Sequence, residues 1–496
     1  METKYMLAID QGTSSTKSTI FDQHGTPIAK GQVDLTTLFM DDGFVEQDPE
    51  AIYKNVLASV AKCVENFLEN GKSAGEIRTI GISNQRETFV VWDKTGTPLY
   101  NAVVWQCKRS IAICNRLISQ GLKSTIKSTT GLIIDPYFSG TKLMWLYENN
   151  EKVKTAVDEG NAYFGTVDTW LLFKLTKGKC YLTDHTNASR TLFFNLQTLN
   201  WDKSLLEMFG LGNLNLPTIK PSSFDYGTSD FEGLFDRELP IQAMIGDSHA
   251  AAFGEGCFEQ GQAKATLGTG CSIMMNAGDK LPAAGDGIVT TICYSTPTRV
   301  DYALEGVIVS CGSTIEWLRR EMGLFNQVGE TEVMATRVAD NNGVYLIPAF
   351  SGLGAPYWDM SRKGEIKGLT FESSKNHIVR AGLESIAYQI RDVIDAMKSN
   401  GTIDLQSLVV NGGITSNTFV LGLLVDLVSK KLALGTSDAS GLGAAYLAGL
   451  GAGLFKDIDD IKANLKPKTF VESNGNNVKI HENYSQWLSY LNYNIR

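Results

Sequence analysis

Residues 5–21 read Y-M-L-A-I-D-Q-G-T-S-S-T-K-S-T-I-F, and this stretch decides the fold. Tyr5–Ile9 is an apolar run of the length of one buried strand, too short for a helix. Residues 10–12, D-Q-G, interrupt the run, and Ser15–Phe21 resumes with β-favouring residues. The stretch therefore predicts a β-hairpin whose turn is polar.

The turn of this hairpin has the composition of a phosphate site. It carries three hydroxyl side chains, those of Thr13, Ser14 and Ser15. Hydroxyls and a row of backbone amides suit phosphate oxygens, and Lys17 adds a cation. Asp10 leaves the end of a buried strand and could hold a divalent metal ion. An ordinary polar turn is the alternative, and one such hairpin favours phosphate binding only modestly.

The second half of the chain repeats this plan. Gln262–Leu267 predicts a strand, residues 268–270 (G-T-G) a tight turn, and Ser272–Asn276 a second strand. Two such hairpins, one in each half, would hold a polyphosphate from both sides. The repetition makes coincidental Gly-Thr turns the weaker interpretation.

Composition and charge exclude several classes of protein. The length of 496 residues corresponds to about three domain-sized units or two large domains, and 43% hydrophobic residues are enough to form sizeable cores. The net charge of −9 argues against a nucleic-acid partner or an anionic membrane surface. No run of apolar residues is long enough to span a membrane, and no signal peptide is expected. Eight scattered cysteines without C-x-x-C indicate reduced thiols in the cytoplasm.

Strands and helices alternate along the chain, which is typical of an α/β fold. Further strands are predicted at 27–35, 79–83, 89–92 and 409–411. Asp48 followed by Pro49 predicts the start of a helix with an apolar stripe. Residues 441–453 predict a small-residue helix suited to close packing, and the polar tail from Asn464 is expected to be peripheral. A boundary near 246–256 predicts two domains, residues 1–252 and 253–496.

Several longer strings carry a family resemblance. They read N-Q-R-E-T at 84–88, Y-F-S-G-T-K-L-M-W-L-Y-E-N at 137–149, T-N-A-S-R at 186–190, P-A-F-S-G-L-G-A-P-Y-W at 348–358, G-E-I-K-G-L at 364–369 and H-I-V-R-A-G-L-E at 377–384. Over nearly its full length the chain resembles the FGGY family of carbohydrate kinases, and within it most closely the glycerol kinases. The resemblance implies two ribonuclease-H-like, actin-type ATPase domains with a cleft between them.

The resemblance also implies an activity and its cofactors. The expected reaction is ATP-dependent, Mg²⁺-assisted phosphorylation of a primary hydroxyl of a small polyol, with glycerol the first candidate. Asp247 is implied as the general base, and Asp10 and Asp247 as the Mg²⁺ site. The nucleotide would contact residues in both halves: Thr13, Ser14, Ser15, Lys17, Thr269, Gly312, Glu316, Gly413 and Asn417. Without the resemblance, Asp247 could be merely the N-cap of a helix over residues 250–252.

The acceptor is expected among residues of the first half and the second hairpin. The resemblance assigns it to Arg86, Glu87, Trp105, Tyr137, Asp247, Ser248 and Ser272. Arg86 and Glu87 would bind vicinal hydroxyls, although such a pair alone is more often a surface salt bridge. Ser248 and Ser272 stand where glycerol kinases carry glutamine and phenylalanine. Two nucleotide-side positions also depart, with Lys17 in place of arginine and Glu316 in place of glutamine.

Two alternatives to a glycerol kinase remain open. One is a kinase of a longer polyol or a ketose, because both serines enlarge the acceptor site. The other is an ATP-driven binding protein of the actin or chaperone type, although such a protein has no need of Arg86, Trp105 or Asp247. The resemblance further implies a homo-oligomer, a dimer or a tetramer.

Overall fold

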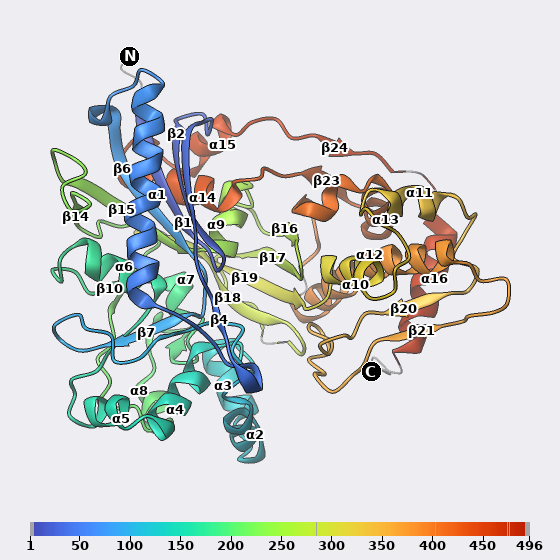
Figure 1. Ribbon diagram of the computed structural model, residues 1–496, viewed down its shortest axis with the longest axis horizontal. Coiled ribbons are helices and arrows are strands. Elements are labelled where there is room, and N and C mark those ends of the chain that lie inside the picture. The colour runs from blue at the N-terminus through green and yellow to red at the C-terminus, as the bar shows by residue number, and fades with distance from the viewer. Residues whose placement is uncertain (1–3, 284, 402, 474, 476, 492–496) are drawn as a thin grey trace.

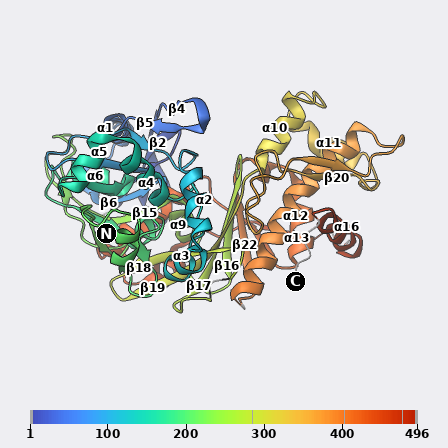
Figure 2. The same cartoon turned by 90° about the horizontal axis from the view of Figure 1, so that it is seen from below.

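The computed structural model describes residues 4–283, 285–401, 403–473, 475 and 477–491. Figure 1 shows two lobes, the first half of the chain in blue and green and most of the second half in yellow to red. Each lobe is built on one large sheet, and Figure 2 shows helices α12, α13 and α16 gathered in the lobe of the second half. The mixed α/β fold predicted from the sequence is confirmed.

The first sheet has the strand order β14-β15-β6-β1-β2-β3. Its strands are β14 (Thr228–Ser229), β15 (Leu239–Gly246), β6 (Ile77–Asn84), β1 (Tyr5–Gln11), β2 (Ser15–Asp22) and β3 (Pro27–Asp34). The hairpin at the start of the chain is confirmed: β1 and β2 are antiparallel, with Asp10 opposite Lys17. Strand β6 lies parallel to β1 on its other side, so the ends of β1, β6 and β15 meet at one edge.

The second sheet has the order β18-β19-β17-β16-β22-β23-β24. Its strands are β18 (Val289–Thr296), β19 (Arg299–Ile308), β17 (Cys271–Gly278), β16 (Gln262–Leu267), β22 (Ser407–Asn411), β23 (Lys431–Leu434) and β24 (Phe470–Val471). Strand β16 pairs antiparallel with β17 and parallel with β22. This is the arrangement of β1 with β2 and β6, which confirms the predicted repetition.

Two helices lie where the sequence predicts them, α1 (Pro49–Glu69) after Asp48 and α14 (Ala439–Gly451) over most of residues 441–453. The other helices of the first half are α2 (Ile111–Ser119), α3 (Lys123–Thr130), α4 (Ser139–Asn149), α5 (Glu151–Asp158), α6 (Val167–Leu175), α7 (His185–Ala188), α8 (Lys203–Met208) and α9 (Asp247–Gly254). Those of the second half are α10 (Gly312–Arg320), α11 (Glu330–Thr336), α12 (Lys375–Gly401), α13 (Thr418–Val428), α15 (Ile458–Asn464) and α16 (Asn477–Tyr490). Asp48 caps α1 as predicted, accepting a hydrogen bond from Glu50 N.

Helix α14 belongs to the second half of the chain but packs on the sheet of the first. Figure 1 shows it beside β1 and α9. A Cβ on Gly81 would lie 2.1 Å from the Ala444 carbonyl oxygen, and one on Gly443 only 1.9 Å from that of Ala250. Close approach of these backbones therefore requires glycine at both positions.

Small sheets complete the molecule. One has the order β4-β5-β8-β7-β9, formed by β4 (Leu38–Phe39), β5 (Val45–Gln47), β8 (Ala102–Val103), β7 (Phe89–Trp92) and β9 (Tyr163–Thr166). Val45, Phe89, Val91, Val103 and Phe164 of this sheet share a core with side chains of α2 to α5. Three two-stranded sheets pair β10 (Leu182–Asp184) with β13 (Thr218–Lys220), β11 (Phe194–Asn195) with β12 (Asn200–Trp201), and β20 (Tyr345–Ile347) with β21 (Glu365–Lys367).

The C-terminal tail differs from the prediction. Helix α16 is not peripheral, because Trp487 is 1% exposed and its ring N–H donates to the Leu346 carbonyl. Tyr484 is also buried in the core of the second half. These aromatic residues stand among polar ones, so the average polarity of the tail concealed its one apolar face. Among the helices of the described ranges, none combines the length and apolarity needed to cross a membrane.

Candidate active site

Asp247 stands where strand β15 passes into helix α9. It is the first residue of the helix, and Gly246 occupies the N-cap position, so the interpretation of Asp247 as the cap is wrong. Its side chain is 38% exposed, and Oδ1 lies 3.3 Å from Nε of Arg86. The turn is held in place by Thr186, whose hydroxyl accepts a hydrogen bond from Gly246 N (2.9 Å). Asp247 thus presents a partly solvated carboxylate from a fixed turn.

Arg86 and Glu87 follow strand β6. They form ion pairs with two different residues, Glu305 and Arg190. Arg86 Nη2 lies 2.7 Å from Glu305 Oε1, and Glu87 Oε1 lies 2.5 Å from Arg190 Nε. All four side chains are nearly inaccessible to solvent. The interpretation as a surface salt bridge is therefore wrong. Glu87 also has φ of 59°, a left-handed conformation that is uncommon outside glycine and clusters at functional sites.

Burial and ion pairing compete in this cluster. Burial raises the pKa of Glu87, although Arg190 and Arg86 oppose that rise. Burial alone would also raise the pKa of Glu305, but Arg190 and Arg86 together outweigh it and hold that pKa below its ordinary value. Glu305 is accordingly a carboxylate between two guanidinium groups.

The two predicted acceptor aromatics join this cluster. The rings of Trp105 and Tyr137 meet edge to face with centroids 5.6 Å apart. The Tyr137 hydroxyl lies 3.5 Å from Arg86 Nη2, which donates to it. The Trp105 ring N–H donates to the Thr13 hydroxyl at 2.9 Å. Residues from three distant segments and the first hairpin are therefore brought together around Arg86.

Ser248 and Ser272 approach one another from the two halves of the chain. Their hydroxyl oxygens are 3.4 Å apart, and the Ser272 hydroxyl donates to Glu305 Oε1 at 3.5 Å. Both serines are partly exposed. They form a small polar surface next to Asp247.

Asp10 lies at the end of β1 and accepts a hydrogen bond from the Ser83 hydroxyl (3.0 Å). Burial, followed by the nearby charge of Asp247, raises the pKa of Asp10 to about 6. The repulsion that Asp10 experiences from Asp247 would be relieved by a cation between the two carboxylates. Mg²⁺ is usually bound by one or two carboxylates with phosphate and water, so the donor set fits it. No group of three or more acidic, His or Cys side chains able to hold a metal occurs in the described ranges.

The other residues of the first turn differ in how accessible they are to a phosphate group. Ser14 and Lys17 are exposed and Ser15 is partly exposed. The Thr13 hydroxyl donates to Gln85 Oε1 at 3.3 Å, so its proton is already engaged. Ser14, Ser15 and Lys17 are the more accessible candidates for phosphate.

The turn of the second hairpin is held by the start of helix α10. Cys311 N and Ser313 N both donate to the Thr269 carbonyl, while the Thr269 side chain is exposed. A Cβ on Gly312 would lie 2.7 Å from the Gly268 carbonyl oxygen. Gly312 therefore lets the helix approach the turn closely.

The remaining nucleotide-side predictions fall on three different kinds of position. Gly413 is exposed, and a Cβ there would meet open space. The side chain of Asn417 caps α13 by accepting from Val420 N and donates to Thr331. Glu316 pairs with Arg319 and Arg320 on α10. The roles of these residues in nucleotide binding stay predictions.

Sequence reasoning assigned no role to several residues of this site, namely Thr186, Asn187, Arg190, Lys264 and Glu305. Asn187 exchanges two amide hydrogen bonds with Asn84, which fixes the segment before Arg86. Lys264 is 1% exposed and donates to the Thr266 hydroxyl at 3.2 Å. An isolated charge inside an apolar strand, as at Lys264 and Glu305, was the available signal.

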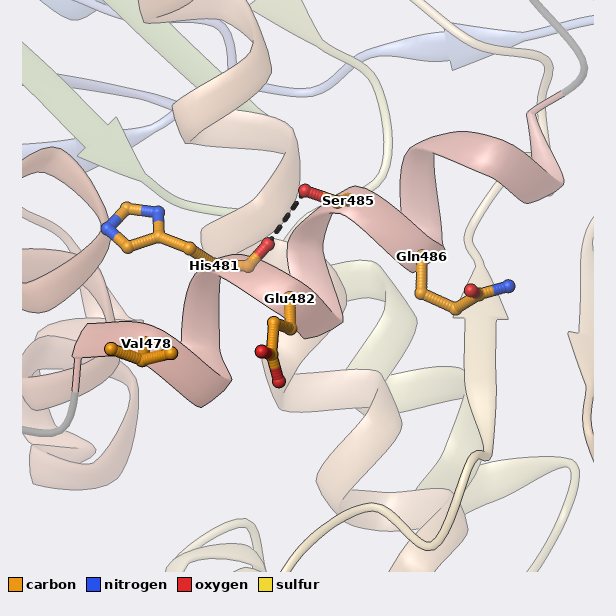
Figure 3. Close-up of a pocket in the computed structure, with 5 residues that line it drawn as sticks. All are labelled: Val478, His481, Glu482, Ser485 and Gln486. Atoms are coloured by element: carbon orange, nitrogen blue, oxygen red, sulfur yellow. Dashed lines mark hydrogen bonds between the residues drawn. The ribbon is translucent and has the colours of Figure 1, made fainter.

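A surface hollow lies away from this cluster. It has a volume of about 650 Å³ and is lined by one flank of α16. Figure 3 shows its five side chains, with the Ser485 hydroxyl donating to the His481 carbonyl. None of the residues expected at the active site lines it.

Comparison with known proteins agrees with this geometry. Residues 5–254 match the N-terminal domain, and residues 263–452 the C-terminal domain, of the FGGY family of carbohydrate kinases. The chain is 42% identical over 491 residues to a glycerol kinase of Alkaliphilus metalliredigens, covering 99% of this chain and 98% of that protein. It is 46% identical over 466 residues to one of Brevibacillus brevis, covering 94% and 93%.

A solved structure shows the same architecture. The crystal structure of Plasmodium falciparum glycerol kinase with ADP superposes with a TM-score of 0.92 at 32% identity, covering 100% of this chain and 99% of the other. The N-terminal match includes every strand of the first sheet and Asp247, and the C-terminal match includes most of the second sheet. This chain belongs to the FGGY family of carbohydrate kinases.

Proposed function

We propose that this kinase transfers the γ-phosphoryl group of ATP to a primary hydroxyl of glycerol, giving glycerol 3-phosphate. Whole-length relatives named glycerol kinases support this assignment. The observation that carries it is the convergence of Arg86, Tyr137 and Trp105 next to Asp247. Together they supply hydrogen-bonding groups for neighbouring hydroxyls and an aromatic surface for the carbon chain.

In this reaction Asp247 acts as the general base. Its carboxylate accepts the proton of the attacking hydroxyl while Arg86, at 3.3 Å, keeps the carboxylate oriented. Arg86, Glu87, Trp105 and Tyr137 orient the acceptor. Phosphoryl transfer depends mainly on positioning and charge neutralisation, so rigid placement of these groups is what the protein contributes.

The nucleotide and metal are proposed to lie between the two hairpins. Asp10 and Asp247 would hold Mg²⁺, which neutralises charge on the phosphates when bound. Phosphate oxygens would be bound at the first turn by Thr13, Ser14, Ser15 and Lys17 and at the second by Thr269. Gly312, Glu316, Gly413 and Asn417 would line the rest of the nucleotide. Residues 1–252 and 253–496 are proposed as the two domains, with α14 crossing to the first.

The test is formation of ADP from Mg-ATP, measured with and without glycerol. We expect glycerol-dependent turnover and a product whose phosphorus spectrum matches glycerol 3-phosphate. Asp247→Asn serves as the inactive control. ADP formation that is independent of every polyol offered would contradict the assignment.

A longer polyol or a ketose is a second candidate acceptor. The observation in its favour is the pair of half-buried hydroxyls of Ser248 and Ser272, 3.4 Å apart beside Asp247. Small polar side chains there could bind an additional hydroxyl. Assays with tetritols, pentitols and ketopentoses at equal concentration distinguish the two candidates by kcat/KM.

We also propose that the enzyme works in the cytoplasm as a homo-oligomer. All eight cysteines are free thiols, as expected in a reducing compartment. Leu369 and Phe371 are large apolar residues that are exposed on the surface of the second half. Contacts between copies would remove them from water. Light scattering of the purified chain tests the oligomeric state.

A further inference from the structure

Strand β19 carries a charged residue that the proposed reaction does not use directly. Glu305 has no accessible surface, and it lies on the sheet of the second half of the chain. A buried carboxylate is costly unless it is paired and hydrogen-bonded. Its partners therefore indicate why a carboxylate occurs at this position.

Both partners of Glu305 come from the first half. Oε1 lies 2.7 Å from Arg86 Nη2, and Oε2 lies 2.5 Å from Arg190 Nη1. Each arginine reaches one further carboxylate, Asp247 for Arg86 and Glu87 for Arg190. The result is a row of alternating charges, Asp247–Arg86–Glu305–Arg190–Glu87. Only its Asp247 end is open to solvent.

This row fixes the rotation of the Arg86 guanidinium. Nε faces Asp247 and Nη2 faces Glu305. Nη1 is buried and has no hydrogen-bond partner among the described residues. Nη1 and Nη2 of Arg190 and Oε2 of Glu305 also lack a hydrogen bond within the described part of the chain, so charge attraction at short range contributes much of what holds the row together.

We propose that Glu305 is a positioning residue for the acceptor. By binding Nη2 it holds the Arg86 guanidinium beside Asp247 and the Tyr137 hydroxyl, while Arg190 secures Glu87 through the same carboxylate. Because Glu305 comes from the sheet that carries the second hairpin, it joins the acceptor residues to that sheet. This inference rests on the proposed function, in which Arg86 and Glu87 bind the acceptor.

A purely structural ion pair is the alternative, and the same strand provides a matched control. Asp301 is equally buried and pairs with Arg299 at 2.6 Å. It also accepts a hydrogen bond from Asn276, so its partners differ from Arg86 and Arg190. Asp301→Asn therefore removes a buried carboxylate from β19 without disturbing the row.

The experiment compares Glu305→Gln, Glu305→Asp and Asp301→Asn with the unaltered enzyme. For Glu305→Gln we expect the KM for the acceptor to rise about tenfold or more, since loss of one charged partner commonly costs at least that factor. The KM for ATP should stay within about twofold. Glu305→Asp keeps the charge and should recover part of the loss. Asp301→Asn should leave the acceptor KM unchanged even if it lowers the melting temperature.

Each outcome decides the matter. An acceptor KM that is unchanged in folded Glu305→Gln, or raised equally in Asp301→Asn, overturns the proposal. If Glu305→Gln does not fold, the acceptor KM of Glu305→Asp is compared with that of Asp301→Asn instead. If neither Glu305 variant folds, the proposal is overturned, because the role of Glu305 is then structural. If the unaltered enzyme does not use glycerol, the proposed function fails separately, and the ratios are taken with whichever polyol supports turnover.

Discussion

The Oδ1 atom of Asp247 lies 3.3 Å from Nε of Arg86, and this contact joins the proposed base to the proposed acceptor site. The two residues are 161 positions apart in sequence, at the ends of the neighbouring parallel strands β15 and β6. Parallel pairing brings the carboxyl ends of both strands to one edge of the sheet. Each of the following predictions depends on this edge or on the packing behind it.

Replacing Asp247 by asparagine should reduce kcat by about 10²–10⁴-fold, because an amide cannot accept the proton of the attacking hydroxyl. Binding of ATP, measured by calorimetry without acceptor, should change little. Asp236→Asn, at an exposed aspartate, is the matched control and should keep full activity. Near-normal turnover of folded Asp247→Asn would show that another group is the base.

Replacing Thr186 by valine should weaken both the fold and catalysis. Its hydroxyl accepts from Gly246 N and donates to the buried Asp184. Removal leaves both groups without this partner, at a cost of about 1–3 kcal/mol in the free energy of unfolding. Because Gly246 precedes Asp247, kcat should fall as well. Thr186→Ser keeps the hydroxyl and should restore both quantities, which urea unfolding and steady-state assays will measure.

The pH dependence of Mg²⁺ binding should follow Asp10, whose pKa is raised to about 6. Protons compete with the metal for this carboxylate, so the apparent affinity for Mg²⁺ should weaken as the pH falls through about 6. In Asp10→Asn the affinity should be low throughout and lose that step. Titration of activity with Mg²⁺ between pH 5 and 8 tests this, and an unchanged step in Asp10→Asn would assign it to another group.

The same group should influence stability with a defined sign. Since the folded pKa exceeds the unfolded value of about 3.9, the carboxyl group favours the folded state while it is protonated, and this contribution is lost as the pH rises through about 6. Asp10→Asn should therefore stabilise the metal-free protein at pH 8 by roughly 2 kcal/mol, allowing for partial solvation. The gain should be about 1 kcal/mol smaller at pH 5. A gain that increases toward low pH is the contrary result.

Two glycines in α14 should respond very differently to alanine. A Cβ at position 443 would lie 1.9 Å from the Ala250 carbonyl oxygen, whereas at Gly441 the nearest atom is 3.7 Å away in the Phe21 ring. Gly443→Ala should destabilise the protein by about 1–3 kcal/mol or more through overpacking against backbone. Gly441→Ala should be neutral or stabilising by up to about 1 kcal/mol, since alanine is the better helix former. Thermal unfolding distinguishes the two, and equal melting temperatures would contradict the packing of α14.

Replacing Ser248 by glutamine and Ser272 by phenylalanine together should sharpen the preference for glycerol. Both changes fill space beside Asp247 where the two hydroxyls now lie 3.4 Å apart. Each methylene-sized difference in fit is worth about 1–3 kcal/mol of discrimination. The measurement is kcat/KM for glycerol relative to tetritols and pentitols in both proteins. A strong preference for glycerol that is the same in both would show that the serines do not set specificity.

Elements that local chemistry specifies could be predicted from the sequence. The hairpin at Tyr5, its repetition at Gln262, the cap at Asp48 and the strand before Arg86 depend on periodicity, turn residues and capping, which act over a few neighbouring positions. The family could also be predicted, because the strings around Arg86 and Tyr137 are long and specific.

Which charges lie next to one another became known only from the folded chain. Glu305 and Arg190 lie 115 positions apart, and nothing local in either segment predicts that one carboxylate holds two guanidinium groups. Only the packing of the two halves against one another encloses these charges so completely that they pair with one another. For the same reason Trp487 was concealed in a polar tail, and α14 was not expected on the first sheet. Whether a residue is buried depends on which distant segments pack over it, and the local sequence pattern does not predict this.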